Sequence, residues 1–316
     1  QGTTCQGNSD FSLHRYVSND MRAFFYVVPS FYAESNTSNK CNNGGTACAE
    51  GPNETTAYYN TGEPHFDIIW GKDQHTGYYP HLTDRRAVPQ NSQQASMTMT
   101  REFIKHGAFS HKSRLLDLGC GRGNMCKVIA ELTGAECTGL DPDAGSIARA
   151  QTMADENPEL RLNFQVGSYA EIPTIFHGRF THVVSMGAFY HAHDKLPAIM
   201  QQVKLALEAP SGVAVISDIV GSDDPISPET RGALFNNPDS NEVLLGRFEW
   251  LRTATEAGLV LQSYDNQDKH ALLAYSQLAE VSWPFPAKSL HERFTNISNA
   301  FRGKKLGRIF NVFVLE

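Results

Sequence analysis

The sequence predicts an α/β fold with a mostly parallel sheet and one antiparallel edge strand. Short apolar runs alternate with helical patterns from residue 114 to residue 264, which is the order expected when helices connect parallel strands. A glycine-rich turn separates the first apolar run from the helix that follows it. Two further apolar runs, at 259–264 and 309–315, close the series, and such a final pair adds an antiparallel strand to a parallel sheet.

The periodicity of apolar residues predicts each element in turn. Ala95, Met99 and Phe103 recur at near-helical spacing and predict the first helix. We expect strands at 114–118, 137–140, 162–166, 180–185, 213–218, 259–264 and 309–315. We expect helices at 93–106, 124–132, 142–155, 194–208 and 248–257, and a helical segment at 270–300 that Trp-Pro-Phe-Pro interrupts at 283–286. Residues 221–238 are rich in Asp, Pro, Ser and Asn, so we expect an insertion or a loop there.

The turn after the first strand carries the most specific motif of the chain. Residues 115–123 read Leu-Leu-Asp-Leu-Gly-Cys-Gly-Arg-Gly, and the next strand ends at Asp141. A strand, a glycine-rich turn, a helix and a second strand with a terminal carboxylate form a βαβ unit that binds nucleosides. A dinucleotide site would have its third glycine where Asn124 stands, and Asp117 before the turn is unfavourable for a pyrophosphate.

A cationic nucleoside without phosphates suits both acids. S-adenosylmethionine has a sulfonium, an ammonium and ribose hydroxyls that a carboxylate can accept from. The pattern Asp-x-Gly-x-Gly-x-Gly followed by Gly-x-Asp is the signature of class I methyltransferases. We therefore expect a Rossmann-like class I methyltransferase sheet, with S-adenosylmethionine as cofactor and S-adenosylhomocysteine as product. The alternatives are a nicotinamide-dependent dehydrogenase and a non-catalytic cofactor-binding module.

The composition limits the classes of molecule that we expect this protein to bind. The net charge is −7 and no long Lys/Arg run occurs, which argues against a nucleic-acid substrate. No apolar run approaches the ~20 residues that a membrane span needs. We expect a small-molecule acceptor as partner, and a monomer or a homodimer. The expected compartment is the cytoplasm, or an organelle if a targeting segment was removed before Gln1.

The six cysteines suggest no metal site. Cys120, Cys126 and Cys137 lie in the nucleoside-binding unit and are expected to be small buried thiols. Cys41 and Cys48 flank a polar segment and could pair. There is no Cys-x-x-Cys spacing, so no metal is expected.

Several segments beyond the glycine motif resemble the sarcosine and dimethylglycine N-methyltransferases that make glycine betaine. The segments are Tyr58-Tyr59, Ile69-Trp70-Gly71, His75-x-Gly77-x-Tyr79, 167–173, Ala188-Phe189-Tyr190-His191 with Asp194-Lys195, 270–278 and 303–306. The resemblance covers about residues 57–316. It implies methyl transfer to a small polar metabolite, with the amine nitrogen of a glycine derivative as acceptor, in the synthesis of an osmolyte.

Two observations leave the acceptor open. The His-x-Gly-x-Tyr element is shared with tocopherol and cyclopropane-forming methyltransferases. Gly187 stands where the betaine-type pattern has an acid just before Ala-Phe. The alternative is S- or O-methylation of another small acceptor, such as a thioether that becomes a sulfonium solute, or a hydroxyl compound.

The resemblance divides the chain into three expected parts. These are an N-terminal extension with a mobile loop at 1–56, a helical cap over the cofactor at 57–106, and a methyltransferase core at 107–316 with helical lid insertions near 221–247 and 266–303.

The residues expected at the cofactor are His75, Thr76, Asp117, Gly119, Gly121, Asp141, Ser168, Tyr169 and Met186. Asp117 is expected to hold the amino end through the turn, and Asp141 the ribose hydroxyls. Ser168 and Tyr169 are expected beside the adenine, and Met186 at the methionine part, because ligands bind at the C-terminal ends of parallel strands. The structural alternatives are that Asp117 caps a helix or a turn and that Gly119 and Gly121 only allow the geometry of the turn.

The expected catalytic residues are Tyr190, His191 and His193, which follow the fourth strand. Either histidine is a candidate base for an acceptor that must lose a proton, and His191 is expected to face the site. Alternatively, each histidine caps a helix or lies as a polar side chain at the surface. The His-x-His pair has no third metal ligand with clear spacing. The residues expected around the acceptor are Trp70, Tyr78, Tyr79 and Gly187, the aromatic ones as a wall that attracts a cation.

Overall fold

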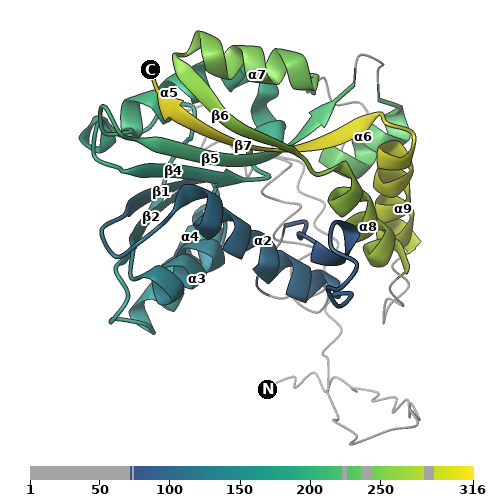
Figure 1. The fold of residues 1–316 in the computed structure, drawn as a ribbon, viewed down its shortest axis with the longest axis horizontal. Coiled ribbons are helices and arrows are strands. Elements are labelled where there is room, and N and C mark those ends of the chain that lie inside the picture. The colour runs from purple at the N-terminus through teal and green to yellow at the C-terminus, as the bar shows by residue number, and fades with distance from the viewer. Residues whose placement is uncertain (1–71, 73–74, 223–225, 236–242, 281–287) are drawn as a thin grey trace, which may run out of the picture. The chain divides into compact units, whose positions relative to one another are not determined.

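The computed structural model describes residue 72 and residues 75–222, 226–235, 243–280 and 288–316 (Figure 1). The predictions for residues 1–56, for Trp70, for the pair Cys41 and Cys48, and for the interruption at 283–286 lie outside the described residues.

A seven-stranded sheet forms the centre of the described chain, in the order β3-β2-β1-β4-β5-β7-β6. The strands are β1 (Arg114–Leu118), β2 (Glu136–Asp141), β3 (Leu162–Val166), β4 (His182–Met186), β5 (Val213–Gly221), β6 (Leu259–Asn266) and β7 (Leu306–Leu315). Neighbouring strands from β3 to β5 are parallel, and β7 runs antiparallel to β5 and β6. The expected mostly parallel α/β sheet is therefore confirmed, with its antiparallel strand at the β6 end (Figure 1).

Helices cover both faces of the sheet. The helices are η1 (Pro80–Leu82), α2 (Ser92–Gly107), α3 (Asn124–Thr133), α4 (Ala144–Asp155), η2 (Thr174–Phe176), η3 (Phe189–Lys195), α5 (Leu196–Ala206), α6 (Pro228–Phe235), α7 (Arg247–Glu256), α8 (Asp268–Glu280) and α9 (Lys288–Arg302). Figure 1 shows α2, α3 and α4 on one face and α5 and α7 on the other. An apolar cluster fills the space between the sheet and the helices on each face. Because alternate strand residues point to opposite faces, Val184 and Val215 pack against the first group of helices, and Val183 and Ile216 pack against the second.

A third apolar cluster joins α6, α8 and α9 near the end of β5. Residues 221–238 were expected to be an insertion or a loop, and the structure has the helix α6 in this segment. Pro228 begins the helix, at a position where the backbone N–H that proline lacks would have no partner within the helix. Ala233, Leu234 and Phe235 are buried against α8 and α9. The turn-forming composition of the segment is offset by this tertiary burial.

One disulfide lies between α3 and β2. Cys126 and Cys137 are bonded, and their Cα atoms are 5.5 Å apart. The expectation of two free thiols is wrong for this pair, since α3 packs on β2 closely enough for a bridge. Cys120 is a buried free thiol, as expected.

The C-terminal ends of β1, β4 and β5 and the first residues of β7 meet at one edge of the sheet. Met186 pairs with Ser217, and Ile219 pairs with Arg308. Paired residues point to the same face, so Met186, Ser217 and Arg308 lie on the face that α2 covers. Ligands of parallel sheets bind at this edge.

Candidate active site

The glycine turn after β1 is held against the end of β2. The backbone N–H groups of Gly119 and Cys120 donate to Leu140 O, at 2.8 and 3.2 Å. The Asp141 carboxylate accepts from Gly121 N and from Asp143 N, both at 2.9 Å. Asp143 in turn caps α4 by accepting from Ser146 N at 2.8 Å. The acid at the end of β2 and the turn after β1 therefore form one rigid unit.

Asp117 is a buried acid directly before this turn. It is 1% exposed, and its Oδ1 has no hydrogen-bond partner in the described part of the chain. Burial, reinforced by the Asp141 charge, raises the pKa of the Asp117 carboxyl to about 8. Burial also raises the pKa of Asp141, against the opposing effect of its backbone hydrogen bonds. Two acids whose ionised form is disfavoured mark a place where a cation would bind favourably.

Two glycines face open space beside these acids. Gly121 has φ +53° and Gly187 has φ +65°, and a Cβ at either position would meet nothing within 4 Å. Gly119 differs, because its Cβ would lie 2.3 Å from Ala188 Cβ. Gly121 and Gly187 therefore leave room for a ligand, whereas Gly119 permits the loops after β1 and β4 to approach.

Ser168 and Tyr169 follow β3 on the other side of the turn. Ser168 is exposed, and its Oγ accepts from Ala170 N at 3.1 Å. The Tyr169 hydroxyl donates to Ala188 O at 3.4 Å, and its ring lies 5.5 Å from the Phe189 ring. Tyr169 thereby joins the loops after β3 and β4.

The segment from His75 to Tyr79 is held from several sides. Ser96 Oγ donates to His75 O at 2.8 Å, and Tyr78 N donates to Ala95 O at 2.9 Å. The carbonyl of Thr76, which is 6% exposed, accepts from Arg308 Nη1 at 3.0 Å. These contacts join the segment to α2 and to β7.

The two described tyrosines of the expected aromatic wall have different surroundings. The Tyr78 ring stacks on His270, with 4.2 Å between ring centroids. The Tyr79 side chain is fully buried, its hydroxyl donates to Gln277 Oε1 at 2.9 Å, and burial raises its pKa. The structure thus places Tyr79 in the packing between α2 and α8.

The two histidines after β4 also have different surroundings. His193 is buried, its Nε2 lies 2.8 Å from Asp218 Oδ2, and its Nδ1 accepts from Leu245 N at 3.0 Å. The Asp218 carboxylate accepts further bonds from Trp250 Nε1 and from Tyr190 N, at 3.0 and 3.1 Å. Both nitrogens of His193 are thus engaged within the protein.

His191 lies beside Tyr190 and Phe235, at ring-centroid distances of 3.9 and 6.3 Å. Burial, with Arg293 and His193 nearby, lowers its pKa to about 3. The imidazole is therefore uncharged at neutral pH and is a weak base.

Asp218 and Arg308 are buried polar residues of this region that no sequence motif marked, whereas His270 begins the segment 270–278 of the family resemblance. Asp218 and Arg308 lie in apolar runs that were assigned as strands or their ends, and His270 lies in a helical pattern. His270 Nδ1 accepts from Tyr79 N at 2.9 Å, and burial lowers its pKa to about 4. A charged residue inside an apolar strand pattern was the available signal for Asp218 and Arg308.

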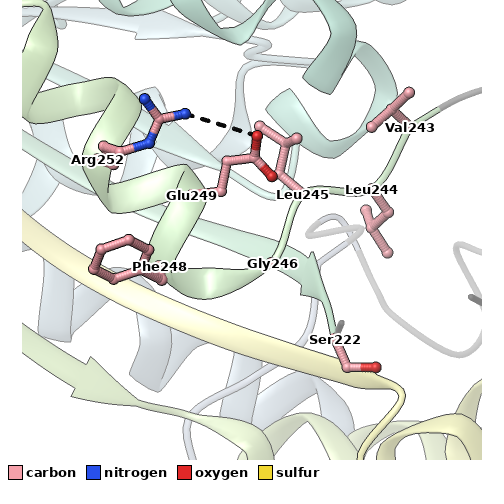
Figure 2. Close-up of a pocket in the computed structure, with 8 residues that line it drawn as sticks. All are labelled: Ser222, Val243, Leu244, Leu245, Gly246, Phe248, Glu249 and Arg252. Carbon is pink, nitrogen blue, oxygen red and sulfur yellow. Dashed lines mark ion pairs between the residues drawn. The ribbon is translucent and has the colours of Figure 1, made fainter. Parts of the chain in front are cut away.

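A surface pocket of about 520 Å³ lies elsewhere, at the start of α7. Figure 2 shows its lining residues, which are Ser222, Val243, Leu244, Leu245, Gly246, Phe248, Glu249 and Arg252. Arg252 and Glu249 form an ion pair at 3.8 Å, and Phe248 is 80% exposed. This pocket adjoins the loop that binds His193 and contains none of the residues expected at the cofactor.

Two further observations concern metals and membranes. Within residues 75–222, 226–235, 243–280 and 288–316, no three His, Cys, Asp or Glu side chains are grouped so as to hold a metal ion. No helix of the same residues combines the length and apolar character that a membrane crossing needs.

Residues 115–210 match the family model of the methyltransferase domain. The match includes the glycine turn, Asp117, Asp141 and the loop after β4. This chain carries a class I, S-adenosylmethionine-dependent methyltransferase domain. The cofactor of this domain class is S-adenosylmethionine, and the buried acid Asp117, the carboxylate Asp141 and the open space at Gly121 and Gly187 fit a cation with ribose hydroxyls.

Curated relatives of this methyltransferase domain act on different acceptors. Tocopherol O-methyltransferase of Arabidopsis thaliana is 26% identical over 171 residues, covering 50% of this chain and 47% of the relative. Norajmaline N-methyltransferase of Rauvolfia serpentina is 28% identical over 204 residues, covering 62% and 66%. The chain thus spans about half to two thirds of the length of these relatives.

Solved structures share the fold of this methyltransferase domain. A protein from Galdieria sulphuraria, assigned as a sarcosine dimethylglycine methyltransferase, has a TM-score of 0.67 and 19% identity, covering 81% of this chain and 98% of its own. Geranyl diphosphate C-methyltransferase of Streptomyces coelicolor, in complex with S-adenosyl-L-homocysteine, has a TM-score of 0.69 and 16% identity, covering 85% and 100%.

Proposed function

We propose that this protein transfers a methyl group from S-adenosylmethionine to a small polar metabolite. The observation that carries the proposal is the pair of acids around the glycine turn, where Asp117 is buried, Asp141 is half-buried and Gly121 faces open space. Gly187, at the end of β4, opens onto the same edge of the sheet. The cofactor supplies an activated methyl group, so the protein mainly aligns the reactants and excludes water.

Each expected cofactor residue has a proposed task. Asp117 accepts the ammonium of the methionine part, which pairs its buried Oδ1. Asp141 is already fixed by two backbone donors and accepts from the ribose hydroxyls with its remaining lone pairs. Tyr169 and Ser168 border the adenine, and Met186 borders the methionine part. His75 and Thr76 cover the cofactor from the segment held by α2 and β7.

The surroundings of the two histidines favour an acceptor with a free lone pair. His193 has both nitrogens engaged, so we propose that it positions the loop after β4 rather than moving a proton. His191, with its pKa lowered to about 3, is a weak base and instead orients or desolvates the acceptor beside Tyr190. A neutral amine or a thioether needs no base, whereas a hydroxyl or a protonated amine must lose a proton.

We propose the amine nitrogen of a glycine derivative, of the sarcosine or dimethylglycine type, as the acceptor. The product would be a methylated amino-acid osmolyte. The Galdieria sulphuraria protein of the same fold is assigned to that chemistry. A thioether that becomes a sulfonium solute is the alternative that also needs no base.

A hydroxyl acceptor is the second candidate. Tocopherol and ubiquinone-biosynthesis O-methyltransferases are among the sequence relatives, and that similarity favours it. A phenol would need a base stronger than His191 in its present surroundings.

A methyl-transfer screen tests these proposals. The protein would be incubated with S-adenosylmethionine and, in turn, with dimethylglycine, a thioether and a phenol, and the products would be identified by mass spectrometry. We expect methylation of the amine, with a rate that rises with pH as the free amine forms. Transfer to the phenol alone would support the second candidate. Cofactor binding without transfer to any of the three would contradict the proposed acceptor classes.

A further inference from the structure

Arg308 has a buried guanidinium that is only partly hydrogen-bonded by the described residues. It lies near the start of β7 and is 2% exposed. Its Nε donates to Ser217 Oγ at 2.9 Å, and its Nη1 donates to Thr76 O at 3.0 Å. Its Nη2 has no hydrogen-bond partner in the described part of the chain. Since a guanidinium has five N–H donors, two of them remain available on Nη2.

The nearby carboxylates do not form ion pairs with this guanidinium. Within the described residues, none lies in ion-pair distance of it. Asp268 accepts the backbone N–H of Arg308 but pairs with the Arg247 side chain. Asp218 accepts from His193 and from Trp250.

The Arg308 side chain nevertheless keeps its charge. Burial lowers its pKa to about 10, while Tyr275, Asp218 and Tyr79 act in the opposite direction, so it is protonated at neutral pH. A buried charge with an unsatisfied donor is costly, so a water, an ion or a ligand that pairs with it is stabilising.

Ser217 connects Arg308 to the end of β4. The Ser217 hydroxyl accepts from Arg308 Nε, and the Ser217 carbonyl accepts from Gly187 N at 2.7 Å. Arg308 is thus linked through a single residue, Ser217, to Gly187, beside which a Cβ would meet nothing within 4 Å. Thr100 adds a second unsatisfied group, because its buried Oγ1 has no partner among the described residues and lies one helical turn beyond Ser96, which holds His75.

Asp117 and Arg308 would bind groups of opposite charge at two separate places along the C-terminal ends of the parallel strands. Asp117 lies on β1, and Arg308 lies on β7, with β4 and β5 between them. Three strand spacings, about 14 Å in all, separate the two backbones. The ammonium and carboxylate of one amino acid share a carbon atom, so a cofactor whose ammonium lies at Asp117 leaves Arg308 for a different molecule.

We propose that Arg308 Nη2 binds a carboxylate of the methyl acceptor and thereby selects acceptors with an anionic group. This rests on the proposed function, since it places the acceptor between Gly187 and β7. Thr76 and Ser217 hold the other guanidinium nitrogens, so the charge is oriented before the acceptor arrives. The contact is charge-assisted and shielded from water, which makes it selective against analogues of the same size that lack the carboxylate charge.

The test compares dimethylglycine with its amide, which has nearly the same shape but an uncharged carboxamide in place of the carboxylate. Binding to the protein loaded with S-adenosylhomocysteine would be measured by calorimetry for the wild type, Arg308→Gln, Arg308→Lys and the exposed control Arg179→Gln. We expect Arg308→Gln to weaken dimethylglycine binding by roughly 10- to 100-fold, and Arg308→Lys by less. Binding of the amide and of S-adenosylhomocysteine should stay within about twofold of the wild type.

Several results would contradict the proposed contact between Arg308 and the acceptor carboxylate, which we call the anchor. Equal losses for dimethylglycine and its amide would indicate a purely structural arginine. Loss of cofactor affinity with an unchanged preference for dimethylglycine would assign Arg308 to the cofactor's carboxylate. If Arg308→Gln does not fold, acetate and acetamide would be compared as inhibitors of the wild type, and we expect inhibition by acetate only. Equal inhibition by both, or by neither, contradicts the anchor.

Failure of the anchor and failure of the proposed function are distinguishable. If the wild type methylates dimethylglycine and its amide with equal kcat/KM, the function stands and the anchor fails. If it transfers no methyl group to either but binds dimethylglycine through Arg308, the anchor stands and the proposed acceptor fails.

Discussion

His193 donates its Nε2 hydrogen to Asp218 Oδ2 across 2.8 Å, because its Nδ1 already accepts from the Leu245 backbone N–H. The tautomer is therefore determined by a backbone donor. Trp250 and the Tyr190 backbone bind the same carboxylate, so three segments of the chain, β5, η3 and α7, meet at Asp218.

Loss of this imidazole should destabilise the fold. We expect His193→Ala to lower the free energy of unfolding by about 3 kcal/mol or more, since it leaves a buried carboxylate with fewer donors. Denaturant unfolding measures this, with His177→Ala as the exposed control. Normal stability together with abolished turnover would instead indicate that His193 moves a proton.

His191 should affect turnover without setting a pH optimum. We expect His191→Ala to reduce kcat with S-adenosylmethionine affinity mostly kept, because the imidazole lies beside Tyr190 in the loop after β4. Since its pKa is lowered to about 3, the wild-type pH profile should show no inflection from His191 between pH 6 and about 8. An inflection near neutral pH that disappears in His191→Ala would contradict this.

Two glycines form a matched pair for testing the site. Gly187 and Gly178 have φ +65° and +64°, and a Cβ at either would meet nothing within 4 Å. Alanine should therefore cost a similar strain at both, about 1–2 kcal/mol. Only Gly187→Ala should also impair cofactor or acceptor binding, because Gly178 lies in an exposed turn. Calorimetric titration and thermal melting separate the two effects, and unimpaired binding in Gly187→Ala would place the ligand elsewhere.

Asp117 should make cofactor binding and stability respond oppositely to pH. Its pKa is about 8 in the folded protein against 3.8 for the free side chain, so the folded state holds a proton that the unfolded state releases. Stability from this group is present below pH 3.8 and is lost as pH rises to about 8, while affinity for a cation increases over the same range.

Asp117→Asn should remove both responses. At pH 9 we expect the cofactor-free variant to be about 1–3 kcal/mol more stable than the wild type and to bind S-adenosylmethionine more weakly. Melting curves and titrations from pH 5 to about 9 measure both quantities. A variant that keeps the wild-type pH dependence would show that another group is responsible.

Asp141→Ala should weaken S-adenosylmethionine binding by roughly 1–3 kcal/mol, because hydroxyls and the Gly121 N–H lose their acceptor. Asp155→Ala is an exposed control at the end of α4. Equal affinities for wild type and Asp141→Ala would remove the proposed ribose contact.

The fold could be predicted from local patterns because strands β1 to β5 and their helices follow one another along the chain. Local composition did not locate the helix α6, because tertiary burial decides the structure of that segment. The segment containing α6 is turn-like in composition, yet Phe235 and its neighbours are buried against α8 and α9.

The glycine turn and its two acids could be predicted because they lie within one βαβ unit. The partners of Asp218 and Arg308 could not, since Arg308 and Thr76 are 232 residues apart and only the folded sheet brings them together. The same long-range packing explains why Tyr79, expected in a wall, is buried against α2 and α8.

The position of β7 has a consequence for how this chain acquires its site during synthesis. β7 follows β6 along the chain but lies between β5 and β6 (Figure 1). Until residues 306–315 leave the ribosome, β5 has an unpaired edge, β6 has no neighbour, and the Thr76 carbonyl lacks its guanidinium donor. The cofactor turn can form early, yet both open edges stay available for incorrect pairing until then. A nascent chain shortened within β7 should therefore be a substrate for chaperones rather than a weakly active enzyme.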